Sequence, residues 1–174
     1  MQIQNKKDII IIVNCVNGHI HSPLRLPQFE EVCRRLDIVI KDEVILTKNS
    51  YYFAGFFDAN GCISYNLNKL EISISHKYIV NIQLLQNMFC GDILFMQTEQ
   101  GDLRIWRVIR RADILKITAY FKAKCKSNKS VLFFLVDDYF RLLDLHAYKS
   151  DNIHHNDWLL FVAKWEARTE FRTF

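Results

Sequence analysis

The sequence lacks any long uninterrupted hydrophobic run. Its longest apolar stretches, Ile9 to Val13 and Val131 to Val136, are far shorter than the roughly 18 residues that a membrane-spanning helix requires. Half of the 174 residues are nevertheless hydrophobic, which excludes a disordered chain and predicts one domain, or one domain plus a fragment, around a buried core. We therefore expect no membrane partner.

Signals for export, import and zinc binding are also missing. The start, Met1 to Asp8, is polar and contains an acid but no Arg, which is unlike a secretory signal or a transit peptide, although such a chain could still be made inside an organelle. No C-x-x-C pair occurs, so reduced thiols are expected rather than a zinc site at Cys15, Cys33, Cys62, Cys90 and Cys125. Adjacent His154 and His155 would diverge by about 100° on a helix and are expected in a polar loop.

The charge balance is only mildly basic, at +4, and alone it is weak evidence for a nucleic-acid partner. The distribution of the basic residues is more informative, because they form two clusters that could line a phosphate backbone. A solvated helix face or loop is the alternative. The clusters are Arg104, Arg107, Arg110 and Arg111, and Lys122, Lys124, Lys126 and Lys129.

The nine residues Phe53 to Gly61, with the sequence FAGFFDANG, predict a helix that packs closely on another helix. Small residues at Ala54, Gly55 and Ala59 let two backbones approach, and Gly61 supplies an unconstrained residue where the helix ends. An ordinary buried helix end is the alternative. The aromatic side chains expected to point into the core are Phe53, Phe56 and Phe57.

Residues 62–68 and 70–76 alternate apolar and polar side chains and predict a β-hairpin. Its polar face would carry small hydrogen-bonding groups that can address base edges in a major groove, unless it is simply the solvated face of a sheet. The residues of that face are Ser64, Asn66, Asn68, Glu71, Ser73 and Ser75.

The remaining pattern predicts an α+β protein with the element order αββαββα. A helix is expected over 77–90, a second hairpin over 92–97 and 103–109, and further helices over 112–121, 131–148 and 157–167. Ahead of the motif, a helix is expected over 28–36.

The FAGFFDANG motif and this element order resemble the LAGLIDADG homing endonuclease and maturase family. The resemblance implies that residues 50–174 form a half-unit whose four-stranded antiparallel sheet builds one side of a DNA-straddling saddle. Residues 1–49 resemble the tail of a preceding half-unit, or are an N-terminal extension, yet no first motif is present. The motif helix would then need a second helix from another copy or a separate chain.

In this family the eighth motif residue is an acid that holds the catalytic divalent metal, whereas this chain has Asn60 there. An amide brings no negative charge, and Mg²⁺ prefers carboxylates. Asp58 lies about 200° around the helix and is a poor substitute. The resemblance makes Lys124 the best match to the family's basic active-site residue, and His76 stands where the family often has Gln. The structural alternatives are a surface lysine at Lys124 and a strand-end cap at His76.

The leading hypothesis is a cleavage-impaired protein without a cofactor that binds structured RNA, such as an intron or ribosomal RNA. The polar sheet face would lie toward the bases, with Arg104, Arg107, Arg110 and Lys124 near phosphates. One alternative is an active, Mg²⁺-dependent DNA endonuclease working as a dimer. The other is a structural subunit of a ribonucleoprotein assembly such as the ribosome. We expect an organelle-encoded protein of the mitochondrial matrix.

Overall fold

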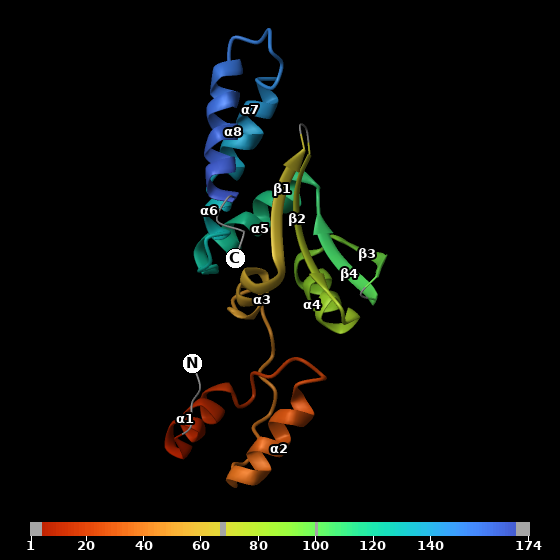
Figure 1. Ribbon diagram of the computed structural model, residues 1–174, viewed down its shortest axis with the longest axis vertical. Helices are drawn as coiled ribbons and strands as arrows, with labels where there is room; N and C mark the ends of the chain where they lie inside the picture. The colour runs from red at the N-terminus through yellow and green to blue at the C-terminus, as the bar shows by residue number, and fades with distance from the viewer. Residues whose placement is uncertain (1–4, 67–68, 100, 170–174) are drawn as a thin grey trace. The chain divides into compact units, whose positions relative to one another are not determined.

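The computed structural model describes residues 5–66, 69–99 and 101–169, and the chain divides into two compact units, residues 1–47 and 48–174 (Figure 1). The division lies two residues before the boundary that the sequence suggested at 49/50. No helix among the described residues is long and apolar enough to cross a bilayer. All five cysteines are free thiols.

The first unit contains two helices, α1 (Lys6–Val16) and α2 (Leu26–Leu36). Its small core consists of Val13, Phe29 and Cys33. Helix α1 was not predicted, because its apolar residues run together rather than recurring every three or four positions. Helix α2 begins two residues earlier than predicted, with a proline in its first turn, where a missing N–H costs no helical hydrogen bond.

The second unit confirms the predicted α+β class. Helix α3 (Tyr52–Asn60) leads into β1 (Gly61–Asn66) and β2 (Lys69–His76), and α4 (Ile79–Phe89) leads into β3 (Asp92–Thr98) and β4 (Gly101–Val108). The four strands form one antiparallel sheet in the order β1-β2-β4-β3. Four helices follow: α5 (Arg111–Lys124), α6 (Ser130–Phe133), α7 (Val136–Asp144) and α8 (His155–Thr169).

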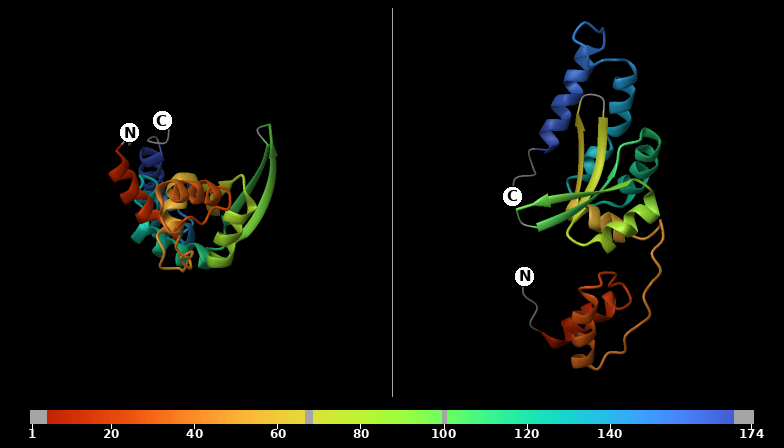
Figure 2. Two further views of the ribbon diagram at one scale, coloured as in Figure 1. Left: turned by 90° about the horizontal axis from the view of Figure 1, so that it is seen from below. Right: turned by 90° about the vertical axis from the view of Figure 1, so that its right-hand side faces the viewer.

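One face of the sheet packs against α3, α4 and α5, and the opposite face is left without helices (Figure 2). Ile72 and Ile74 of β2 and Trp106 of β4 are completely buried on the packed face. At about 25 cal/mol per Å² of apolar surface, such residues supply most of the driving force for folding. The strands therefore present one face to the core and leave the other available to a partner.

The long helix predicted over 131–148 is wrong in one respect, because it is two helices, α6 and α7, separated at Phe134 and Leu135. The residues on either side of the break, Leu132, Phe133, Leu135 and Val136, are buried, so no polar residue marks the break in the sequence. The chain leaves α7 through His146, which has a left-handed φ of 54°. His155, predicted in a loop, instead begins α8, and its ring nitrogen lies 3.1 Å from the carbonyl oxygen of Ala147.

Candidate nucleic-acid interface

The predicted polar residues of the first hairpin share the face of the sheet without helices. Glu71 pairs with Ser64, and Ser73 of β2 pairs with Arg107 of β4. Directly paired residues of antiparallel strands point to the same side, so Asn66 and Ser75, two residues along, join them. We call this set, Ser64, Asn66, Glu71, Ser73, Ser75 and Arg107, the polar sheet face. Asn68 lies outside the described residues.

Two cations lie on this side of the sheet: Lys69, which pairs with Asn66 and is exposed, and Arg107. Arg107 lies among the polar residues of both β2 and β4. Its Nε is buried and has no hydrogen-bond partner, and no carboxylate among the residues that the structure describes lies within ion-pair distance of it. Buried polar groups of native proteins are nearly always paired, but the Nε of Arg104 on the opposite face also lacks a partner. The position of Arg107 on the face without helices is therefore what makes it a candidate to bind an acceptor. Phosphate and base-edge oxygens are both suitable acceptors.

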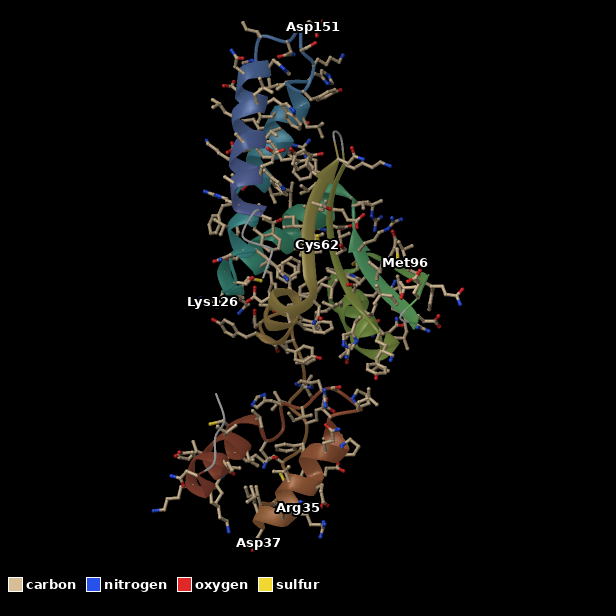
Figure 3. The ribbon with its side chains drawn as sticks, viewed as in Figure 1. Arg35, Asp37, Cys62, Met96, Lys126 and Asp151 are labelled. Atoms are coloured by element: carbon tan, nitrogen blue, oxygen red, sulfur yellow. The ribbon has the colours of Figure 1, made fainter. Side chains whose placement is uncertain are left out.

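The middle of the outer half of this face is apolar, which the sequence did not predict, and Asp92 and Thr98 of β3 lie at its two ends, where Asp92 pairs with Arg107. Leu94 and Met96 of β3 pair with Ile105 and Leu103 of β4 and continue the surface toward the sheet edge. Met96, labelled in Figure 3, is 50% exposed. The sequence did contain a signal for this apolar surface, because the strands of the second hairpin carry apolar residues at both odd and even positions and so on both faces of the sheet.

The other arginines predicted near phosphates lie elsewhere. Arg104 pairs with His76 and with Phe95, on the face that carries Trp106, and its guanidinium carbon lies 5.4 Å from the centre of the Phe95 ring. Arg110 immediately precedes α5, and its Nε lies 2.9 Å from a carboxylate oxygen of Asp113. Neither is part of the polar sheet face.

The motif helix α3 presents two small residues to solvent. Gly55 and Ala59 are exposed, they lie one turn apart, and nothing lies within 4 Å of where a Cβ on Gly55 would be. Ala54, predicted on the same face, is instead 1% exposed in the core of its own unit, where its carbonyl oxygen accepts a hydrogen bond from the Cys125 thiol at 3.7 Å. The exposed small face is therefore narrower than the sequence suggested.

Gly61 ends α3 for a different reason from the one predicted. Its φ of −81° and ψ of 154° are an extended conformation that any residue adopts, not a left-handed one. A Cβ at this position would instead overlap the ring of Phe57. Close approach of the strand to that buried ring, rather than backbone freedom, requires the glycine.

Asn60 stands exposed at the C-terminal end of α3, and its side-chain nitrogen donates only a long, 3.4 Å bond to the carbonyl oxygen of Phe56. Asp58 is engaged elsewhere: its carboxylate accepts the backbone N–H of Lys126 at 2.8 Å and the hydroxyl of Ser127 at 2.6 Å. Partial burial of Asp58 opposes ionisation, but these hydrogen bonds outweigh it and hold the pKa of the carboxyl below its usual range. Asp58 thus anchors the loop after α5.

The basic side chain at this end of α3 is Lys129, not Lys124. The Lys129 ammonium donates to the carbonyl oxygens of Asp58 at 3.0 Å and Ala59 at 3.4 Å. Lys124 reaches the other end of the helix, where it donates to the carbonyl oxygen of Asn49 at 2.9 Å. The loop after α5, marked by Lys126 in Figure 3, turns the chain so that the later lysine returns to the motif.

His76 lies on the helix side of the sheet rather than on the polar sheet face. Its ring centre is 5.2 Å from that of Phe56, and its Nδ1 accepts the backbone N–H of Tyr78 at 3.1 Å. The side-chain nitrogen of Asn81 lies 3.4 Å from the same ring nitrogen. The contacts match the strand-end cap that was the alternative interpretation of this residue.

The residues at the end of α3 do not fit a divalent metal. Among the described residues no group of three or more His, Cys, Asp or Glu side chains could hold an ion. Asn60 is neutral, Asp58 is committed to the loop, and the Lys129 ammonium places a positive charge on the last carbonyl oxygens of the helix. A cation would meet repulsion here rather than ligands.

No family model matches the chain. The intron-encoded RNA maturase bI4 of Saccharomyces cerevisiae is 35% identical over 175 residues, which are 94% of this chain and 27% of that protein. This similarity spans the motif helix and the αββαββα unit described above. The chain belongs to the LAGLIDADG homing endonuclease and maturase family.

Two other intron-encoded proteins are similar to this chain. A probable intron-encoded endonuclease aI2 of Debaryomyces hansenii is 28% identical over 96% of this chain and 29% of its own length. The intron-encoded DNA endonuclease ai2a of Dictyostelium discoideum is 24% identical over 88% of this chain and 52% of its length. The chain thus spans about a quarter to a half of the length of these relatives.

Solved structures of LAGLIDADG proteins also align. The homing endonuclease I-GzeII, in complex with a DNA target, gives a TM-score of 0.47 and 18% identity over 61% of this chain and 40% of that one. The homing endonuclease I-TnaI gives a TM-score of 0.45 and 21% identity over 60% of this chain and 78% of that one.

Proposed function

We propose that this chain is a nucleic-acid-binding protein derived from a LAGLIDADG homing endonuclease, and that it binds structured RNA without cleaving it. The observation that carries the binding is the polar sheet face, where the unpaired Arg107 stands among small hydrogen-bonding side chains on a surface that no helix covers. With Lys69, which pairs with Asn66, such a surface offers two cations for the backbone and several groups for base edges.

The end of α3 supports the absence of cleavage. Hydrolysis of a phosphodiester by this family's chemistry needs carboxylates that hold divalent ions. This chain offers the neutral Asn60, and the Lys129 ammonium binds the last carbonyl oxygens of the helix, so the negative charge that would hold an ion is lacking. In a homodimer both copies would carry the same defect.

RNA is favoured over DNA by the relative that is named an RNA maturase, the most identical of the three relatives compared above. A basic surface alone attracts either backbone. We further propose that the protein is encoded and works in an organelle, the mitochondrial matrix, because its relatives are intron-encoded proteins.

The experiment that tests this function crosslinks nucleic acid to the native protein and sequences what is recovered, with an Arg107→Gln variant alongside. We expect RNA of defined sequence with the native protein and little with the variant. Recovery of duplex DNA alone would contradict RNA binding. Equal recovery with both proteins would contradict the polar sheet face.

Cleavage is tested on double-stranded target DNA with Mg²⁺, using the native chain, Asn60→Asp, and Asn60→Asp combined with Lys129→Met. We expect no cleavage product from the native chain. We expect the double variant to bind the cation at a lower Mg²⁺ concentration than the single variant, because Lys129 repels the ion. Efficient metal-dependent cutting of both strands by the native chain would overturn the proposal.

A second candidate function is an active DNA endonuclease whose partner supplies the missing acid. Relatives named as endonucleases favour it. In that case cleavage appears only when a second LAGLIDADG chain is added, and as nicks in one strand. The structural-subunit alternative has no observation of its own in support.

A further inference from the structure

A cavity of about 390 Å³ lies on the helix side of the sheet, away from the polar sheet face. Helices α4 and α5 and the segment just before α3 form its walls. Its volume falls within the range of small-molecule sites. Its lining combines aromatic and aliphatic side chains with three lysines, Lys48, Lys116 and Lys124.

The charges of this cavity are unbalanced. Within the part of the chain that the structure describes, no carboxylate lies within ion-pair distance of Lys48, Lys116 or Lys124. Asp113, the acid of the lining, is neutralised by Arg110 at 2.9 Å. Three uncompensated ammonium groups around one hollow concentrate positive potential there and favour an anion.

The apolar wall contains two aromatic rings in contact. The ring centres of Phe89 and Tyr120 lie 5.0 Å apart, and the Tyr120 hydroxyl donates to the carbonyl oxygen of Ser50 at 2.5 Å. The Lys124 ammonium is fixed by Asn49 and lies 4.1 Å from the centre of the Tyr51 ring. A flat ring can lie against this wall while its anionic group meets the lysines.

We propose that this cavity binds a nucleotide, its base against Phe89 and Tyr120 and its phosphate between Lys48, Lys116 and Lys124. The nucleotide is either a free mononucleotide or an unpaired nucleotide of a bound strand, since both carry the same base and phosphate. This site is separate from the polar sheet face, and the proposal does not rest on RNA binding there.

The test titrates the full chain with AMP and with a single-stranded RNA oligonucleotide, using Lys116→Glu and, as a matched control, Lys164→Glu. Lys116 and Lys164 are both exposed on helices, but Lys164 lies on α8, outside the cavity lining. We expect Lys116→Glu to weaken binding about tenfold or more, because it replaces a charge-assisted contact with a repulsive one. Lys164→Glu should leave binding near the native value.

The outcomes separate the sources and the alternatives. AMP binding that Lys116→Glu abolishes supports a free nucleotide; no AMP binding, with oligonucleotide affinity lowered by Lys116→Glu alone, supports a nucleotide within a strand. Ribose 5-phosphate binding as tightly as AMP would overturn the assignment to a nucleotide, and equal effects of both variants would overturn the site. Arg107→Gln should leave AMP binding unchanged, because Arg107 lies outside the cavity. A failure of nucleic-acid binding by the polar sheet face can therefore be distinguished from a failure of the cavity site.

Discussion

Two residues of α3, Asp58 and Asn60, have different surroundings because of their positions around the helix. They are two positions apart, so a helix turns them about 200° from one another. Asp58 consequently faces the loop after α5 and Asn60 faces solvent, as their contacts confirm. The sequence predicted this division correctly because it depends only on helix geometry.

Asp58 should make stability depend on pH at the acid end. Its folded pKa lies below the unfolded value, so its contribution is fully present above the unfolded pKa and is lost as the pH falls through the folded one. We expect Asp58→Asn to lower the unfolding free energy at pH 7 by about 1 kcal/mol for each weakened hydrogen bond. Thermal melts from pH 7 to 3 should be flatter for the variant; an unchanged profile would contradict the role.

The two glycines of the motif should respond oppositely to alanine. Gly61→Ala would drive a Cβ into the Phe57 ring and should destabilise the fold, as overpacking usually does by about 1–3 kcal/mol. Gly55→Ala meets open space on a helix and should stabilise the isolated chain by about 0.8–1 kcal/mol. Denaturant unfolding of both variants checks this, and equal midpoints would contradict it.

Lysine placement is where prediction at this scale failed. Lys124 and Lys129 are five residues apart and chemically identical, and the sequence favoured the first. The choice depends on where α5 stops and on how the next residues turn back toward Asp58. A loop's path is set by such tertiary contacts, which spacing does not encode.

At the scale of elements, both hairpins were predictable from alternation and turn residues, and their described bounds differ from the prediction by at most two residues. Helices were harder. The break between α6 and α7 and the whole of α1 were missed because buried residues surround the break and apolar residues run together in α1. Periodicity is informative only where one side is polar.

Strand β4 offers a matched pair for testing nucleic-acid contacts. Arg104 and Arg107 are three residues apart and face opposite sides of the sheet. Arg107→Gln should lower affinity for all sequences and flatten the slope of log affinity against log salt by roughly 0.7 to 0.9, as expected for one lost phosphate contact. Arg104→Gln should leave the slope unchanged. An equal change in both variants would refute the assignment of faces.

The first hairpin should instead determine sequence preference. Asn66 and Ser73 lie on the polar sheet face and carry groups that can address base edges. Asn66→Ala and Ser73→Ala should change which sequences are selected from a random pool, with little change in salt dependence. Selection of the same sequences by both variants and the native chain would contradict base contact.

At the scale of the whole molecule, packing of α3 against another helix stays a prediction, motivated by the exposed small residues Gly55 and Ala59. We expect the chain to self-associate or to bind a separate LAGLIDADG chain. Gly55→Leu should weaken assembly by forcing the two helices apart. Ala163→Leu, on an exposed position of α8, is the control. Light scattering that finds a monomer indifferent to Gly55→Leu would contradict the interface.

The origin of residues 1–49 as the remnant of a preceding half-unit stays a prediction. The fold of the second unit followed from the motif and from alternation. The first unit did not, because its apolar side chains reach a core of only three buried residues and many remain outside it, Val39 and Ile45 at 86% and 84% exposure. A segment with so little core carries a weak signal of its own fold.

Each unit happens to contain a completely or almost completely buried thiol, Cys33 at 0% exposure in the first and Cys125 at 5% in the second. A thiol shielded by packing reacts with an alkylating reagent only when its surroundings open. The alkylation rate of each buried thiol therefore reports how often its own unit opens. Because only three buried hydrophobic residues form the core of the first unit, Cys33 should be alkylated well before Cys125. A ligand that binds the first unit alone should slow the reaction of Cys33 and leave that of Cys125 unchanged.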